Sequence, residues 1–492
     1  MKKIKSEYLI LSLVLSFSAF FRLFRLNLLL GFWYDQGRDA LVISDLLHYG
    51  KFFLIGPVTG IEGIFLGPFY YYLLVPFYWL GKGSPVVAAA GLGWITIGAI
   101  FLIYLLAKQM YDRRIGLVAA FLYGFSYNLV VFSRWLANPN PLPFFTLLVL
   151  IFLYKFISCQ NFKFLILSSF LIGLCLQLEA ASAVFFLPAT LAILIWQRKR
   201  VFGVKYVRYL VLSMIAFSLT LFPQIVFNFR HQGILVSAFR QFLVGEKSFS
   251  LSLGQMAKMR VLTYYEAFFS KLIPNGSWLR LVSLALFSAT AFFSRKKIFN
   301  QGGKLLLVWL IVPILGFFFY RGNHGYVWDY YFTGVIPAFF ILFSVGLTCL
   351  WQKNMFGKVM VGLFLTGFLA INIQFLNNYY KTGIGITLRA QERAIDWIYN
   401  DAGESDFNVD VYVPPQIYFS YSYLFQWYGK AKFGREPETK LVNNLYTLEE
   451  PDGEHPQFLV AWLKRQEEIG RIVKEYSWGD ITVQKRERVK YE

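Results

Sequence analysis

The chain has 492 residues, of which 57% are hydrophobic, 20% aromatic and 15% charged, and its mean hydropathy is +0.49. A soluble globular chain carries about 25% charged residues, so this composition excludes a soluble enzyme and indicates a protein that folds in a lipid bilayer.

The net charge of +20 comes entirely from the first 379 residues, which hold 33 basic and ten acidic residues, whereas residues 380–492 hold 15 and 18. This distribution argues against nucleic-acid binding, which requires basic residues clustered on a soluble face. It indicates topology signals in a membrane domain, residues 1–379, and an anionic lipid as a partner.

Eleven apolar runs are long enough, or nearly long enough, to cross a bilayer, which takes about 20 residues. The runs lie at about residues 8–30, 85–107, 115–132, 141–157, 164–178, 180–196, 209–227, 279–293, 305–320, 330–351 and 357–376. Short basic loops follow every second run, and such loops stay in the cytoplasm. The pattern predicts a multi-pass protein of the cytoplasmic (plasma) membrane, with a cytoplasmic N-terminus and an extracytoplasmic C-terminal domain.

The first outer loop, residues 31–84, holds four of the ten acidic residues of the membrane domain. Its residues 36–49 have helical spacing and predict a helix in the membrane interface. Residues 64–80 are apolar and aromatic. They predict a second interfacial helix, because a twelfth span would place the later basic loops outside.

Asp35 stands at the start of the first predicted interfacial helix. A carboxylate at this position can cap the first helical amides. Alternatively, Asp35, Arg38 and Asp39 share one helical face and form a polar site. The arginine would then keep a carboxylate ionised, as a general base acting on a hydroxyl requires. The residues alone leave both interpretations open.

Residues 380–492 predict a small external α/β domain with one core. Residues 387–402 read as an amphipathic helix, 407–413 as a strand and 418–428 as a helical aromatic segment. Strands are also expected at 458–463, 471–476 and 481–485. This domain contains no catalytic constellation.

Three segments carry a family resemblance: the acid-led outer loop at 34–39, the Gly-Pro-aromatic stretch at 67–72, and residues 132–141 after a basic cytoplasmic loop. In order and placement they resemble the GT-C glycosyltransferases that use polyprenyl-phosphate sugars. This group includes the protein O-mannosyltransferases and the lipid A aminoarabinose transferases. The resemblance is clearest over residues 8–200.

The resemblance implies a GT-C fold and a sugar transfer with inversion, from a polyprenyl phosphate to an acceptor lipid, glycan or protein at the outer face. Asp35 matches the acid that acts on the acceptor. The chain departs from the family pattern at Gln36, where many members have Glu, and at Gly67, where the aminoarabinose transferases have Lys. Asn138 and Asn140 stand where several relatives have a second acid.

The candidate site follows from this resemblance and from the polar residues of the outer face. Candidate contacts to the donor phosphate are Arg38, Arg134 and Arg321. Candidate contacts to the sugar or acceptor are Asp39, Glu62, Asn138, Asn140, Gln177, Glu179, Asp329 and Tyr331. Arg134 serves equally well as an anchor for lipid headgroups.

No His or Cys spacing predicts a metal site. The sequence requires no cofactor, although a divalent cation is compatible with phosphate departure. A flippase or transporter of lipid-linked sugars is an alternative, but it would place more polar residues along the spans. Two further alternatives are a glycan ligase that uses a pyrophosphate carrier and a non-enzymatic envelope scaffold.

Overall fold

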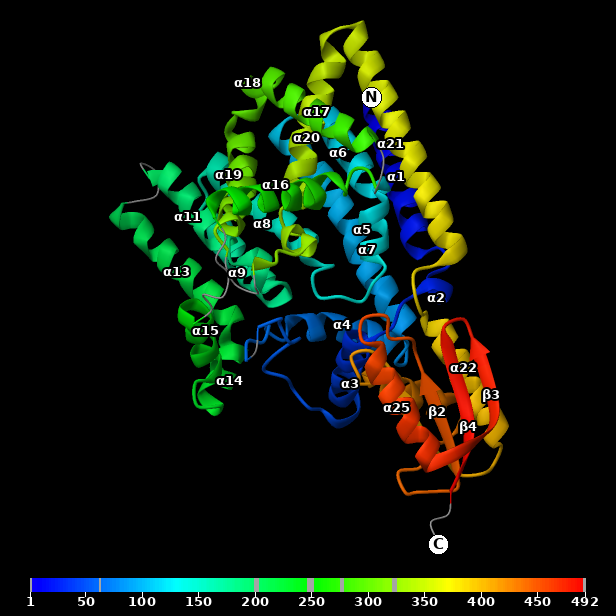
Figure 1. The fold of residues 1–492 in the computed structure, drawn as a ribbon. Coiled ribbons are helices and arrows are strands. Elements are labelled where there is room, and N and C mark those ends of the chain that lie inside the picture. The colour runs from blue at the N-terminus through cyan, green and yellow to red at the C-terminus, as the bar shows by residue number, and fades with distance from the viewer. Residues whose placement is uncertain are drawn as a thin grey trace.

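The computed structural model describes residues 2–61, 63–198, 203–245, 252–274, 278–320 and 325–489. The helices form a bundle, and a small α/β domain lies beyond the end of the bundle that is distant from the N-terminus (Figure 1). The elements of the bundle are α1 (Lys2–Leu23), α2 (Leu26–Leu29), α3 (Tyr34–Tyr49), α4 (Phe69–Leu80), α5 (Pro85–Met110), α6 (Arg113–Phe125), α7 (Tyr127–Ser133), α8 (Leu142–Cys159), α9 (Lys163–Leu178), α10 (Ala180–Ala183), α11 (Phe186–Trp196), α13 (Val204–Thr220), α14 (Phe222–Arg230), α15 (Ile234–Gly245), α16 (Leu253–Phe269), α17 (Trp278–Phe293), α18 (Arg295–Ile298), α19 (Gln301–Phe318), η2 (Asp329–Phe332), α20 (Ile336–Lys353) and α21 (Met355–Thr382).

Each of the eleven predicted spans coincides with a helix, a pair of helices or a short helical run of the bundle. In the described residues, six helices are long and apolar enough to cross a membrane, and up to eight spans result if each bent pair counts as one. Lys163–Leu178, Ala180–Trp196 and Trp278–Phe293 are apolar but shorter. The protein is therefore a multi-pass helical membrane protein, while the count of eleven spans stays a prediction.

Two of the predicted spans are bent helix pairs. The chain turns by 63° between α6 and α7 and by 58° between α13 and α14. At the first bend Ser126 is extended, and its hydroxyl caps α7 by accepting the amide of Leu129 at 3.3 Å. At the second bend Pro223 opens α14, and a proline has no amide hydrogen to continue the preceding helix.

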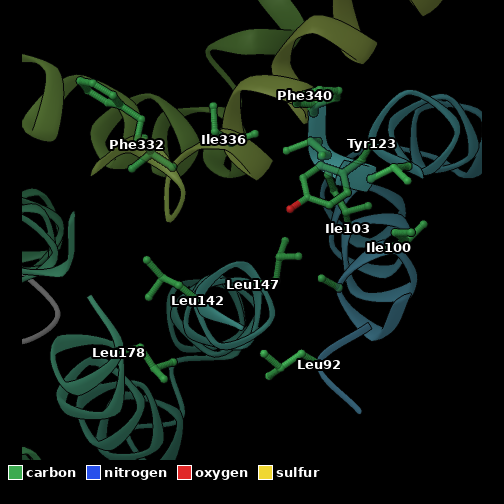
Figure 2. Close-up of a cluster of buried hydrophobic side chains, with 14 of the residues drawn as sticks. Leu92, Ile100, Ile103, Tyr123, Leu142, Leu147, Leu178, Phe332, Ile336 and Phe340 are labelled. Carbon is green, nitrogen blue, oxygen red and sulfur yellow. The ribbon is translucent and has the colours of Figure 1, made fainter. Parts of the chain in front are cut away.

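The core of the bundle lies around α20, in which every residue from Ile336 to Thr348 is buried. A helix that is apolar on all sides belongs in an interior. In Figure 2, Ile336 and Phe340 of α20 lie in one cluster with side chains of α5, α6 and α8. The rings of Tyr123 and Phe340 meet edge to face at 5.4 Å. This core supports the end of the bundle where the first outer loop lies.

Both predicted helices of the first outer loop are present. Helix α3 begins where the side-chain oxygen of Gln36 accepts the amide of Trp33 at 3.0 Å. It ends at Gly50, whose φ of 63° suits a residue without a Cβ. Helix α4 follows a short ribbon closed by a bridge between Val58 and Phe65. The two helices lie at the end of the bundle next to the α/β domain (Figure 1).

The C-terminal α/β domain has a four-stranded sheet in the order β1-β2-β4-β3. Strands β1 and β2 are parallel, and the other two pairs are antiparallel. Its elements are α22 (Leu388–Ala402), β1 (Phe407–Tyr412), α23 (Phe419–Leu424), the π-helical turn η3 (Phe425–Gly429), α24 (Lys430–Phe433), β2 (Asn444–Glu449), α25 (Pro456–Ile469), β3 (Gly470–Trp478) and β4 (Ile481–Arg488).

Helix α22 and strands β1, β3 and β4 confirm the predictions for this domain, but the strand expected at 458–463 is wrong. Those residues belong to α25, because Pro456 opens a helix that continues through the helix-forming residues 464–468. The six apolar residues alone do not distinguish a strand from a helix. Strand β2 was not predicted.

Candidate active site

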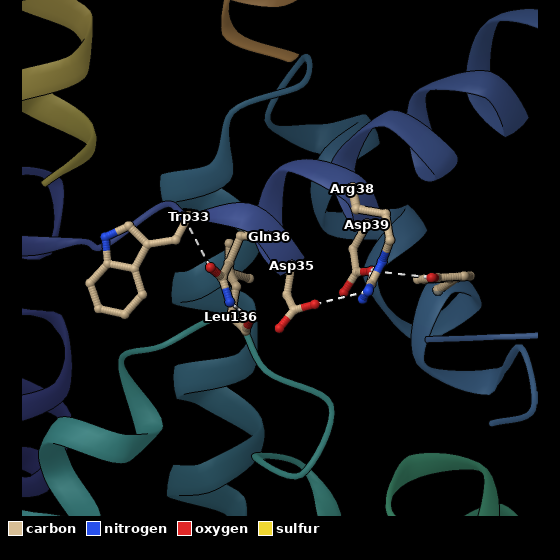
Figure 3. A network of polar contacts seen from close by, with 7 residues as sticks. Trp33, Asp35, Gln36, Arg38, Asp39 and Leu136 are labelled. Carbon is tan, nitrogen blue, oxygen red and sulfur yellow. Dashed lines mark hydrogen bonds and ion pairs between the residues drawn. The ribbon is translucent and has the colours of Figure 1, made fainter. Parts of the chain in front are cut away.

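Asp35, Arg38 and Asp39 form a connected set of ion pairs on α3 (Figure 3). The guanidinium of Arg38 lies 2.8 Å from a carboxylate oxygen of Asp35 and 2.8 Å from one of Asp39. The hydroxyl of Tyr71 on α4 donates to the same oxygen of Asp39 at 3.1 Å. The predicted Asp-Arg-Asp face is therefore present, and the start of α3 is capped by Gln36 rather than by Asp35.

The two carboxylates have different surroundings. The side chain of Asp35 is 60% exposed, whereas that of Asp39 is 8% exposed. Burial raises the pKa of Asp39 to about 6, while the contacts with Arg38 and Tyr71 oppose this rise. Asp35 is thus the carboxylate that is open to solvent, and Asp39 contacts Arg38 from the buried side.

A hydrogen bond from Gln36 links the segment after α7 to α3. The Gln36 amide donates to the carbonyl of Leu136 at 2.9 Å. Asn140 donates to the carbonyls of Phe132, at 2.8 Å, and Trp135. Asn140 is 1% exposed, so its amide nitrogen is not open to solvent and stabilises the turn between α7 and α8 through these hydrogen bonds. The structure therefore gives Asn140 a role in positioning this segment.

Glu179 lies at the break between α9 and α10. One of its oxygens accepts the amide of Ala181 at 3.2 Å, and the other lies 3.5 Å from the amide nitrogen of Asn138. Asn138 also donates to the carbonyl of Leu178 at 2.5 Å. Tyr331 lies within electrostatic range of Glu179. Glu179 is 8% exposed, and among the described residues no Lys or Arg forms an ion pair with it, so its carboxylate is held by amide groups alone.

Gln177 connects α9 to two other elements. Its side-chain oxygen accepts the amide of Phe69 at the start of α4 at 3.0 Å, and its nitrogen donates to the carbonyl of Thr220. A Cβ on Gly67 would lie 2.3 Å from the Gln177 side chain. The absence of a side chain at Gly67 thus makes room for Gln177, which positions α4.

Asp329, at the start of η2, connects that turn to the segment after α16. Lys271, directly after α16, forms an ion pair with Asp329 at 2.6 Å. Tyr330 lies within electrostatic range of Glu179, Asp329 and Asp35. Lys271 was not predicted, although a basic residue at the outer end of the bundle runs against the positive-inside pattern and could have drawn attention to it.

Arg134 caps the end of α1. One nitrogen of its guanidinium donates to the carbonyls of Phe21, Arg22 and Phe24 at 3.1, 2.8 and 2.9 Å, and its Nε donates to the hydroxyl of Tyr379 at 3.1 Å. The remaining nitrogen is buried and has no hydrogen-bond partner among the described residues. Arg134 therefore supports the bundle with most of its donors, and its contact to a phosphate stays a prediction.

A cavity of about 510 Å³ opens between the α2–α3 connection, α7, the end of α16 and η2. Trp33, Trp135, Arg134, Lys271 and Asp329 are among the residues that line it. The predicted residues Glu62 and Arg321 lie outside the described residues. In the part of the chain that the structure describes, no cluster of three or more His, Cys, Asp or Glu residues could hold a metal ion.

The α/β domain docks on both ends of the first outer loop. Four hydrogen bonds cross this interface: Leu388 N to Leu30 O at 2.8 Å, Trp33 Nε1 to Ile386 O at 3.0 Å, Tyr423 Oη to Gly83 O at 2.5 Å and Trp427 Nε1 to Lys82 O at 2.8 Å. Residues of the α/β domain thus form hydrogen bonds with both ends of the loop that carries Asp35.

Gly37 permits the closest approach at this interface. A Cβ at Gly37 would lie 2.2 Å from the backbone nitrogen of Ser420 and 2.5 Å from the backbone carbon of Phe419. Only a glycine lets α3 and α23 come this close. The ring of Tyr34 packs against that of Phe419 at 5.2 Å next to this contact. The contact lies two residues from Asp35, so it bears directly on the position of that carboxylate.

Known proteins share this fold. Residues 67–226, about a third of the chain, match the family described as dolichyl-phosphate-mannose-protein mannosyltransferase. The crystal structure of ArnT from Cupriavidus metallidurans in the apo state is similar with a TM-score of 0.61 and 12% identity, over 96% of this chain and 97% of that one. The same protein bound to undecaprenyl phosphate gives a TM-score of 0.59 at the same identity and coverage. No curated protein matches the sequence.

The fold of the protein follows from these findings. The chain has a GT-C fold, and the resemblance predicted from its sequence is confirmed.

Proposed function

We propose that the protein is an inverting glycosyltransferase that moves a sugar from a polyprenyl phosphate to an acceptor lipid, glycan or protein. Asp35 takes the proton of the acceptor hydroxyl, whose oxygen attacks the anomeric carbon of the donor. The bond from that carbon to the phosphate oxygen breaks on the opposite face, and polyprenyl phosphate leaves with the electron pair. The exposed carboxylate of Asp35, held by Arg38 on α3 within a GT-C fold, carries this proposal.

Negative charge develops on the leaving phosphate and requires nearby positive charge. Arg38 is suited to this role because a guanidinium can make bidentate contacts with phosphate. Glu179, Asp329 and Tyr331 are the proposed contacts to the sugar or acceptor. Their support is that Asp329 lines the cavity beside α3, that Tyr331 lies with it in η2, and that Glu179 lies at the break between α9 and α10. A divalent cation brought by the donor is compatible with this arrangement.

We place the reaction at the outer face of the cytoplasmic membrane. The basic loops of the sequence support a cytoplasmic N-terminus. The α/β domain lies at the same end of the bundle as α3 and α4 (Figure 1), so the domain and the proposed site share one side of the membrane.

The test uses purified protein in nanodiscs, a panel of polyprenyl-phosphate sugars and an envelope extract as acceptor. We expect release of free polyprenyl phosphate by the wild type and its loss in Asp35→Asn. Asp45→Asn is the matched control, because Asp45 lies on the same helix and pairs with Lys51 at 2.8 Å. Equal release by Asp35→Asn would remove Asp35 from the reaction. In sealed proteoliposomes, movement of donor lipid across the membrane without release of polyprenyl phosphate would identify a flippase instead.

A further inference from the structure

The cavity beside α3 has two tryptophans in its wall. Trp33 and Trp135 are each 36% exposed, and their rings lie 5.8 Å apart at an angle of 62°. The Trp33 indole is fixed by its hydrogen bond to Ile386. The volume of about 510 Å³ falls within the range of pockets that take small ligands, about 300–1,000 Å³. The wall therefore offers broad aromatic surface to a ligand of that size.

The charges that line the cavity cancel. Lys271 is paired with Asp329 at 2.6 Å, and Glu266 is paired with Arg280 at 2.7 Å. With Arg134, the lining holds two cations and two acids. A free phosphate in the cavity would meet two carboxylates, and a polyprenyl chain would remove the ion pairs from water without replacing the hydrogen bonds that water makes to them. The balance favours a neutral ligand that can form hydrogen bonds.

A sugar ring has both properties that this lining requires. Its C–H face packs on an aromatic ring, and its hydroxyls donate to carboxylates and accept from amides and ammonium groups. Asp329, Lys271 and Asn128 supply such groups in the lining of the cavity. Trp33, which lines the cavity, stands directly before α3 and precedes Asp35 by two residues. A ring in the cavity would be a neighbour of the proposed reaction centre.

We propose that this cavity is a subsite for a neutral sugar ring, which stacks on Trp135 and hydrogen-bonds to Asp329. The inference rests on the proposed function, because the ring belongs either to the donor or to a glycan acceptor. It also identifies a specificity element, since a charged sugar would meet ion pairs that are already satisfied.

Saturation-transfer difference NMR tests the subsite without requiring transfer. The probes are methyl α-mannoside, methyl β-glucoside and methyl β-N-acetylglucosaminide, with methyl glucuronide as the charged comparison, added to the full-length protein in nanodiscs. We expect saturation of the ring C–H protons of a neutral probe. The signal should fall about three- to tenfold in Trp135→Ala and recover in Trp135→Phe. Trp351→Ala, at the far end of α20 and 42% exposed, should leave it unchanged.

Competition identifies the source of the ring. Displacement of the probe by a polyprenyl-phosphate sugar assigns the ring to the donor, and persistence of the signal in its presence assigns it to an acceptor glycan. Three results would overturn the proposal: no saturation of any neutral probe, an equal signal in Trp135→Ala, or displacement by polyprenyl phosphate that carries no sugar. Since no catalysis is measured, an inactive protein that binds the probes would contradict the proposed function and leave the subsite intact.

Discussion

The contact of Gly37 with α23 provides a direct test of how Asp35 is positioned. In Gly37→Ala the new Cβ would lie 2.2 Å from the Ser420 nitrogen, so α3 and α23 must separate by about 1 Å to reach ordinary contact. Alanine favours the helix itself by about 1 kcal/mol, while overpacking costs about 1–3 kcal/mol. Because the obstacle is backbone rather than a flexible side chain, we expect a small net loss of stability and a displaced α3.

The displacement should be visible in activity. A misplacement of about 1 Å in a catalytic group can cost about 100-fold in rate, so we expect polyprenyl phosphate release by Gly37→Ala to fall by about that factor in kcat, with little change in the KM for the donor. The control is Gly254→Ala in α16, where an added Cβ has no neighbour within 4 Å. A wild-type rate in Gly37→Ala, with normal folding, would show that the approach of α23 does not position Asp35.

Three further predictions concern single groups. In the folded protein the pKa of Asp39 is about 6, whereas its ordinary value is 3.8. As the pH rises from about 3.8 to about 6, the free energy of unfolding of the wild type should therefore fall by up to about 3 kcal/mol relative to that of Asp39→Asn. Thermal melting that shows the opposite slope would mean that the ion pair with Arg38 outweighs burial. Arg134→Lys should lower the free energy of unfolding by at least about 2 kcal/mol, because lysine cannot satisfy three carbonyls and Tyr379 together; a normal melting temperature with reduced kcat would point to phosphate binding instead. EDTA should leave donor cleavage unchanged, and a loss that Mg²⁺ or Mn²⁺ restores would place a metal at the site.

Local sequence patterns predicted many of the helices and strands, and also the part of the site that lies on α3. The spacing of Asp35, Arg38 and Asp39 on one helix determines that their side chains meet, and the structure confirms the contact. The alternation at 407–413 and the amphipathic repeat at 387–402 likewise correspond to β1 and α22. These features depend on neighbours within a few residues, which a single sequence displays.

Contacts between distant segments could not be predicted in this way. Arg134 reads as a free cation at the outer face, yet its partners are carbonyls about 110 residues earlier. Gln177 reads as a polar residue beside a cavity, yet its amide connects Phe69 with Thr220. Every residue has a backbone carbonyl, so the sequence does not indicate which carbonyls a side chain contacts. A side chain that donates to backbone carbonyls therefore looks the same in the sequence as one that binds a ligand.

The composition divides the chain near Tyr379, but the contacts do not follow that division. Residues 380–492 form the sheet domain, and their hydrogen bonds hold the loop of residues 30–83 at both ends. Gly37 places the backbone of α23 against the helix that carries Asp35. A soluble domain could cover a membrane site from outside without touching its catalytic helix. Here α3 contacts both the bundle and the α/β domain, so the geometry of the proposed site depends on both parts of the chain.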